Sequence, residues 1–131
     1  MPNHWLLKTE PSTYSWDDLE REKTTVWDGV SNPVALKNLA AMKPGDDALM
    51  YHTGGEKAVV GLAQVTKAAY PDPKAKDPKL LVVDLVPVKR IARQVTLQEI
   101  KADPLFRDSP LVRQGRLSVV PLADAQFERL R

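Results

Sequence analysis

The chain has no cysteine and only two histidines among its 131 residues. Without cysteine it can form neither a disulfide framework nor a thiolate metal site, which fits a reducing compartment. His4 and His52 have no cysteine and no carboxylate pattern beside them, so they make a poor metal site. We therefore expect no metal and no other cofactor.

Long apolar runs are also missing. No uninterrupted apolar segment approaches membrane-spanning length, and the first residues lack the basic region and apolar run of a signal peptide. The net charge of +2 permits nucleic-acid binding without indicating it. Neither a Gly-x-Ser-x-Gly elbow nor the spacing of a phosphate-binding P-loop occurs. We expect a cytoplasmic, soluble monomer with no membrane partner, folded as a single domain over residues 1–131.

Apolar runs and turn residues predict six strands. The expected strands cover residues 4–9, 24–27, 48–52, 58–69, 80–88 and 117–121. Residues 53–56 read Thr-Gly-Gly-Glu, which is hairpin-turn chemistry, so the strands on either side should pair. Residues 71–78 carry three prolines and predict a surface loop.

Capping residues predict short helices between these strands. The expected helix starts are Ser15 with Asp18, Asn32 before Pro33, and Thr96 with Glu99. One side of the second helix carries Leu36, Leu39, Ala40 and Lys43, with Met42 at its edge, and residues 44–45 should end it. A last helix over 122–130 should turn Phe127 and Leu130 inward. Strands with interspersed short helices indicate an α+β fold.

The stretch Val26-Trp27-Asp28-Gly29-Val30-Ser31-Asn32-Pro33 sets a large aromatic beside a turn and a helix start. The indole of Trp27 can stack on a flat ligand, and Gly29 lets the backbone approach closely. Asp28 can accept a hydrogen bond from an exocyclic amine. Asn32 can recognise a ligand edge, although capping the helix is enough to explain it. For Trp27 the alternative is a core position.

Further segments accompany this stretch along the chain. They are Trp5-Leu6-Leu7-Lys8-Thr9-Glu10-Pro11-Ser12, Tyr14-Ser15-Trp16-Asp17-Asp18-Leu19, Met50-Tyr51-His52-Thr53-Gly54 and Val112-Arg113-Gln114-Gly115-Arg116-Leu117-Ser118-Val119. With these segments the chain resembles the EVE domain of the PUA-like superfamily, from about residue 5 to the C-terminal region. The resemblance implies a PUA-like β-barrel with flanking short helices. It also implies a protein that reads bases, often modified ones, in DNA or RNA.

The resemblance favours a base-stacking role for Trp27 and adds further site residues. The expected base pocket comprises Trp27, Asp28, Asn32, Tyr51, His52 and Thr53. Strand alternation sends Tyr51 and Thr53 to one face and His52 to the other. The expected phosphate contacts at the pocket edge are Lys8, Ser12, Arg113, Arg116 and Ser118. Ser31 and Leu36 stand where the family commonly has arginine, which removes positive charge beside the proposed pocket.

Two other functions remain open. Some ASCH-type domains of the superfamily resemble small amidohydrolases that act on acylated cytidine with Lys, Thr and Glu, and Lys8-Thr9-Glu10 supplies these residue types. Strand alternation argues against this enzyme, because Thr9 should point away from Lys8 and Glu10. A protein-interaction module is the third possibility. The sequence predicts a non-enzymatic reader that accepts a flipped or unstacked base, with a modified cytosine in DNA or a modified base in RNA as ligand.

Overall fold

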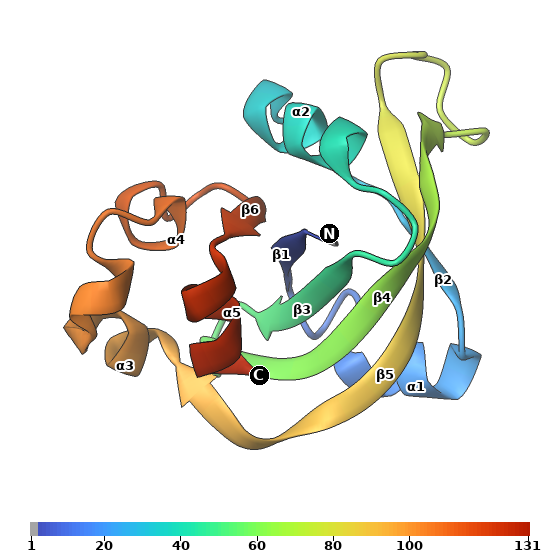
Figure 1. The fold of residues 1–131 in the computed structure, drawn as a ribbon. Helices are drawn as coiled ribbons and strands as arrows, with labels where there is room; N and C mark the ends of the chain where they lie inside the picture. The colour runs from blue at the N-terminus through green and yellow to red at the C-terminus, as the bar shows by residue number, and fades with distance from the viewer. Residues whose placement is uncertain (1–2) are drawn as a thin grey trace.

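A computed structural model describes residues 3–131, which form a mixed six-stranded sheet with helices around it (Figure 1). The strands are β1 (His4–Thr9), β2 (Thr25–Trp27), β3 (Asp47–His52), β4 (Ala58–Pro71), β5 (Leu81–Thr96) and β6 (Val119–Leu122). Their order across the sheet is β2-β5-β4-β3-β1-β6. Strands β1 and β3 run parallel, and the other neighbours are antiparallel. The predicted hairpin across residues 53–56 is confirmed by the pairing of β3 with β4.

The long strands β4 and β5 give the sheet its curvature. Their pairing shifts register at four places, and such bulges bend a strand and increase its twist. Figure 1 shows the two strands sweeping past β3 as long curved ribbons. The edge strands β2 and β6 do not pair with each other in residues 3–131, so the expected barrel is a curled sheet that stays open. The α+β fold class with flanking short helices is confirmed.

Strand β5 is much longer than the sequence predicted. The expected strand over 80–88 continues to Thr96. Its second half is mostly exposed and includes Lys89, Arg90 and Arg93, so it lacks the apolar alternation from which a strand is recognised. Pairing with β4 holds this half in the sheet instead.

Short helices flank the sheet within residues 3–131. They are α1 (Trp16–Glu22), α2 (Pro33–Ala41), α3 (Leu97–Ala102), the 3-10 turn η1 (Pro104–Phe106), α4 (Pro110–Arg113) and α5 (Asp124–Leu130). The predicted helix starts at Ser15, Asn32 and Thr96 are confirmed by their capping hydrogen bonds. η1 and α4 were not predicted, because three or four residues are too few to show a helical period. No helix of the described chain is long and apolar enough to span a membrane.

Only part of the predicted side of α2 is buried. Ala35 and Leu39 are buried, whereas Ala40 and Lys43 are exposed. The helix ends one residue before Met42, whose extended backbone carries its side chain back into the core. The predicted end at residues 44–45 therefore comes too late, because core packing rather than Pro-Gly chemistry ends the helix.

The two ends of the chain meet in the sheet. Strand β1 pairs antiparallel with β6, and the Lys8 N–H donates to the Ser118 carbonyl over 2.9 Å. This pairing confirms that the segments around residues 5–12 and 112–119 lie side by side. The helix α5 then packs on β1, with Phe127 and Leu130 buried as predicted.

Candidate functional site

A hollow of about 800 Å³ opens around β2, between the end of β1 and the end of α1. We call it the β2 pocket. The residues that line it are Lys8, Thr9, Glu10, Thr13, Tyr14, Glu22, Thr24, Thr25, Val26, Trp27, Asp28, Gly29, Lys74 and Asp84. Gly29 has a φ of 78°, a left-handed conformation that favours glycine, and it turns the chain out of β2 toward α2.

Two aromatic side chains form the apolar wall of the β2 pocket. Trp27 and Tyr14 meet edge to face, with ring centroids 6.1 Å apart and ring planes at 87°. Trp27 is only 7% exposed and packs into the hydrophobic core. Trp27 is therefore both a core residue and a lining residue of the β2 pocket. Tyr14 was not predicted as a site residue, although its segment belongs to the family pattern.

Four carboxylates line the β2 pocket, those of Glu10, Glu22, Asp28 and Asp84. Two of them accept hydrogen bonds from tyrosine hydroxyls. The Tyr14 hydroxyl donates to Glu22 and the Tyr70 hydroxyl donates to Asp84, each over 2.6 Å. Burial, together with the bond to Glu22, raises the pKa of Tyr14 to about 12. The bond to Asp84 raises the pKa of Tyr70 to about 12. Both hydroxyls therefore remain protonated donors at neutral pH, and Glu22 and Asp84 each already accept a bond.

The other two pocket carboxylates differ in what they bind. Glu10 accepts hydrogen bonds from the backbone N–H and the hydroxyl of Ser12, over 3.2 and 3.1 Å. Asp28 is exposed and has no hydrogen-bond partner for its carboxylate within residues 3–131. Its oxygens can accept from a ligand. Four carboxylates against Lys8 and Lys74 give the β2 pocket a negative field.

A second hollow, of about 210 Å³, shares Lys8 with the β2 pocket. We call it the lysine pocket. Its lining is Lys8, Tyr51, Thr53, Gly54, Lys57, Leu97, Lys101, Leu111, Val112 and Gly115, which includes three lysines and no carboxylate. The Lys8 ammonium donates to the Gly115 carbonyl over 2.9 Å and lies 5.6 Å from the centre of the Tyr51 ring. Burial lowers the pKa of Lys8 and raises that of Tyr51.

A third hollow, of about 290 Å³, adjoins the lysine pocket at Gly115. Asn32 and Arg116 both line it. The Asn32 side chain also caps α2, accepting from the N–H groups of Val34 and Ala35 over 2.9 and 3.1 Å. The β2 pocket and the lysine pocket thus share Lys8, the lysine pocket and this hollow share Gly115, and we call the three hollows together the band.

The predicted base-pocket residues are divided along this band. Trp27 and Asp28 line the β2 pocket, Tyr51 and Thr53 line the lysine pocket, and Asn32 lines the third hollow. His52 lines none of these hollows, and it lies opposite Tyr51 and Thr53 as strand alternation predicted.

His52 is instead bound within the protein. Its Nε2 accepts the backbone N–H of Trp16 over 3.0 Å, and its Nδ1 lies 2.9 Å from Glu56 Oε1. Because Nε2 must accept, the neutral ring carries its proton on Nδ1 and donates it to Glu56. His52 is 6% exposed, so the Trp16 N–H has no ready access to water as a substitute. This geometry makes His52 a fixed acceptor that holds the start of α1.

We expect His52→Ala to lower the free energy of unfolding by about 1–3 kcal/mol, because it leaves the buried Trp16 N–H without an acceptor. Urea unfolding measures this change. Glu56→Ala is the matched control and should stay within about 0.5 kcal/mol, since the Glu56 side chain is half exposed. If His52→Ala left the stability unchanged but lowered the affinity for a DNA strand, His52 would be a binding residue rather than a structural one.

Only some of the residues predicted to contact phosphate at the pocket edge line the three hollows. Lys8 lines two hollows and Arg116 one. Arg113 is bonded to the Arg107 carbonyl and to Asp108, over 3.1 and 3.2 Å. Ser12 is bonded to Glu10, and Ser118 lines none of the three hollows. The cations that sequence reasoning missed are Lys57, Lys74 and Lys101.

The positions that depart from the family pattern have different surroundings. Ser31 is exposed, directly before the capping residue Asn32. Leu36 is partly buried and packs against the hydrophobic core. Neither lines any of the three hollows. The change at Leu36 therefore adds an apolar contact, whereas Ser31 leaves an uncharged surface beside the third hollow.

Lys8, Thr9 and Glu10 all line the β2 pocket, including Thr9, which strand alternation had placed on the other face. The three side chains still do not bind one another: the Thr9 hydroxyl donates to the Tyr14 carbonyl over 2.8 Å, and Lys8 donates to Gly115. No group of three or more metal-ligating side chains occurs within residues 3–131.

Comparison with known proteins shows which family the chain is similar to. The family model of the EVE domain matches residues 3–131. Thymocyte nuclear protein 1 of Homo sapiens is 32% identical over 163 residues, covering 98% of this chain and 72% of the human protein. A protein from Leishmania major described as hypothetical superposes with a TM-score of 0.91 at 37% identity, covering 98% of this chain and 92% of the other.

A solved complex is similar as well. The human THYN1 protein in complex with DNA containing 5-methylcytosine matches with a TM-score of 0.88 at 31% identity, covering 97% of this chain and 94% of that one. ASCH from Zymomonas mobilis has a TM-score of 0.60 at 10% identity, which shows a shared fold alone.

Proposed function

The chain belongs to the EVE domain family, and on this premise we propose that it is a non-enzymatic reader of a modified cytosine in DNA, bound in the β2 pocket. The observation that carries the proposal is the carboxylate of Asp28, which has no partner within residues 3–131 and lines a pocket walled by Trp27 and Tyr14. A relative of 31% identity, the human THYN1 protein, is described in complex with DNA containing 5-methylcytosine.

The chemistry of the β2 pocket suits cytosine. Cytosine presents an exocyclic amine, and a carboxylate is the acceptor that pairs with it. Thymine and uracil present a carbonyl at the same position, which Asp28 would repel. The ring and a 5-methyl group can pack on the aromatic wall, and a base–aromatic contact contributes about 1–3 kcal/mol. A volume of about 800 Å³ falls within the range of ligand pockets and accepts a base with its sugar.

The distribution of charge along the band agrees with this mode of binding. A base inside a duplex cannot enter a pocket, so the target nucleotide has to be flipped out or lie in an unstacked strand. The β2 pocket is negative and disfavours phosphate, whereas the adjoining lysine pocket is positive. The base and its backbone would therefore occupy different parts of the band.

We infer that the chain performs no chemistry on the base. A nucleophile needs its activating base within hydrogen-bond reach, and Thr9 donates to a backbone carbonyl rather than to Lys8 or Glu10. Incubation with acylated cytidines should return them unchanged by mass spectrometry. A mass-shifted product that disappears in Lys8→Ala and Glu10→Ala would establish the amidohydrolase instead.

We expect the wild-type protein to bind a DNA oligonucleotide with one 5-methylcytosine more tightly than matched strands carrying cytosine or thymine at that position. Asp28→Asn should reduce the preference for cytosine over thymine about tenfold, because an amide can both donate and accept. Fluorescence anisotropy with the three strands, and with an RNA strand of the same sequence, measures both effects.

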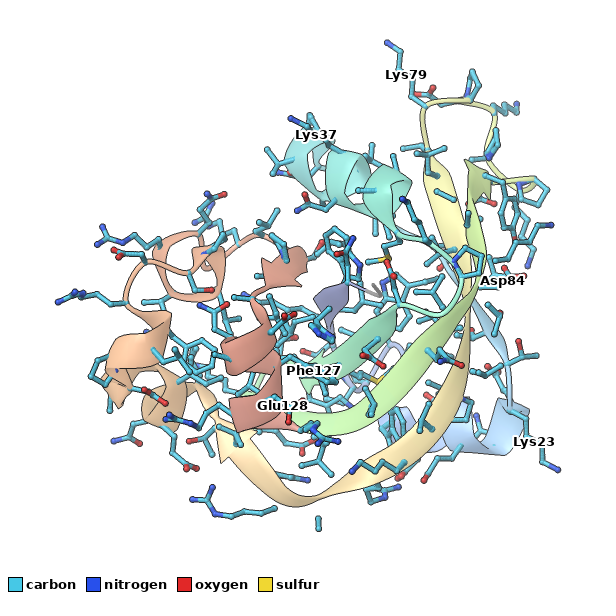
Figure 2. All side chains as sticks on the ribbon, viewed as in Figure 1. Lys23, Lys37, Lys79, Asp84, Phe127 and Glu128 are labelled. Atoms are coloured by element: carbon cyan, nitrogen blue, oxygen red, sulfur yellow. The ribbon has the colours of Figure 1, made fainter. Side chains whose placement is uncertain are left out.

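Glu128→Gln is the control for this experiment, since it removes the same charge from an exposed site. Figure 2 shows Glu128 on α5, well apart from Asp84 at the β2 pocket. The control should keep the wild-type preference. Equal affinity of the wild type for all three DNA strands would refute the reader, and tighter binding to the RNA strand would change the proposed substrate to RNA.

A further inference from the structure

The lysine pocket brings together three ammonium groups from distant parts of the chain. Lys8 comes from β1, Lys57 from the turn between β3 and β4, and Lys101 from α3. No carboxylate of residues 3–131 lines this hollow itself. The two nearby carboxylates are Glu10, which accepts from the Thr53 hydroxyl over 3.4 Å, and Glu56, which lines a neighbouring hollow with Lys57 and Lys101, so the three lysines still exceed them. Like charges held in one concave site focus a positive potential and favour an anion there.

The fold holds these lysines in place through the start of α3. The backbone N–H of Leu97 donates to the Lys57 carbonyl over 2.7 Å, which fixes the turn against the helix. Lys101 lies four residues after Leu97, so both side chains occupy the same face of α3. Lys57 and Lys101 are therefore both held next to Leu97, which lines the same hollow.

Lys8 lies at the boundary between the two hollows. Its ammonium uses one donor on the Gly115 carbonyl, which leaves two donors for a ligand. Its contact with the Tyr51 ring holds the ammonium beside the apolar floor of the lysine pocket. A group bound here is thus next to whatever the β2 pocket holds.

The floor of the lysine pocket is apolar. Tyr51, Leu97, Leu111 and Val112 contribute this apolar part of the lining. Inorganic phosphate alone has no apolar surface to pack on such a floor, whereas a nucleotide offers the carbon face of its sugar. The combination suits a phosphodiester with its sugar.

We propose that the lysine pocket binds the phosphodiester group adjacent to the base held in the β2 pocket, with the neighbouring sugar on its apolar floor. This inference rests on the proposed function, because it takes the ligand to be a DNA strand. It adds Lys57 and Lys101 to the binding residues. It also predicts the path of the DNA backbone, which would run from the β2 pocket to the lysine pocket.

The test combines a protein change with a change in the DNA. The variant Lys57→Gln/Lys101→Gln removes two charges while keeping most of each side chain, and both residues are exposed, so thermal unfolding should be nearly unchanged. The DNA is a single strand with one 5-methylcytosine, either native or with a neutral methylphosphonate at one of the two phosphates flanking that base. Affinity is measured over a range of salt concentrations.

In the wild type, neutralising one of the flanking phosphates should weaken binding about tenfold, as expected when a charge-assisted hydrogen bond is removed. The lysine variant should be about tenfold weaker on native DNA, and the methylphosphonate should then weaken binding less than in the wild type, because only Lys8 is left to contact the phosphate. Its slope of log affinity against log salt should be shallower than that of the wild type, by at most about 0.7 for the one phosphate in the pocket, because Lys8 remains.

The matched control is Lys37→Gln/Lys79→Gln, which changes the net charge equally. Figure 2 shows Lys37 on α2 and Lys79 at the tip of the β4–β5 loop, and neither lines a hollow described above. This control should retain the full methylphosphonate effect. An equal weakening of binding in both double variants would mean a diffuse charge effect and would overturn the lysine pocket as a site.

The outcomes separate this inference from the proposed function. Preference for 5-methylcytosine without coupling between the lysines and a phosphate leaves the reader intact and refutes the lysine pocket. Coupling without any base preference supports the phosphate site and refutes the base pocket. A wild-type protein that binds none of the strands refutes both.

Discussion

Gly61→Ala should lower the free energy of unfolding by about 3 kcal/mol or more, one of the largest effects we expect from a single substitution. A Cβ at Gly61 would lie 2.3 Å from ring atoms of Trp16, far inside van der Waals contact. Trp16 is fully buried, so its ring has nowhere to move. Thermal unfolding should show a decrease of about 10 °C in Tm for a chain of this size.

Gly55→Ala is the control, because a Cβ there meets no atom within 4 Å and its backbone is not left-handed. It should be neutral or slightly stabilising. Combining Gly61→Ala with Trp16→Phe should restore part of the stability, since the smaller ring frees space beside β4. Purely additive destabilisation in the double variant would show that contact with Trp16 is not the reason for the glycine.

Trp27→Ala should cost about 3–5 kcal/mol of stability, as for other buried tryptophans, in addition to weakening base binding. With 7% of its surface exposed and its ring packed against Tyr14, Trp27 supports the core of which it is a part. Guanidinium unfolding measures this destabilisation. An unchanged free energy of unfolding in this variant would mean that the hydrophobic core does not depend on the indole.

Because Trp27→Ala disturbs folding, Trp27→Phe is the better variant for the base-binding test. It keeps an apolar ring in the core but offers a smaller stacking face, so affinity for a 5-methylcytosine strand should fall by several fold. Trp16→Phe is the matched control, since Trp16 is equally buried but lines none of the hollows described above. The reverse pattern, with affinity reduced only in Trp16→Phe, would exclude Trp27 as the stacking residue.

Local chemistry in the sequence was enough for much of the fold. The helix starts at Ser15, Asn32 and Thr96 follow from side chains that bond backbone N–H groups a few residues away, so neighbours along the chain determine them. The hairpin turn at residues 53–56 is local in the same way. The alternation of strands and short helices indicated the α+β class, and the family resemblance, which covers nearly the whole chain, added the PUA-like architecture.

The charges of the site required the tertiary structure. Lys57 and Lys101 lie on a turn and a helix that show no binding pattern, and only the docking of α3 beside Lys8 turns them into one cationic hollow. Sequence distance carries no information about such a meeting, because nonlocal contacts arise from packing rather than from propensity.

The double role of Trp27 was likewise decided by packing. The sequence by itself determined that an aromatic residue stands before a turn and a helix start, together with Asp28 and a capping Asn32. Whether its indole lay in the core or at a pocket depended on where Tyr14 and β5 lie relative to β2. The fold makes Trp27 part of the hydrophobic core and also of the lining of the β2 pocket, because the edge strand β2 lies where the two meet.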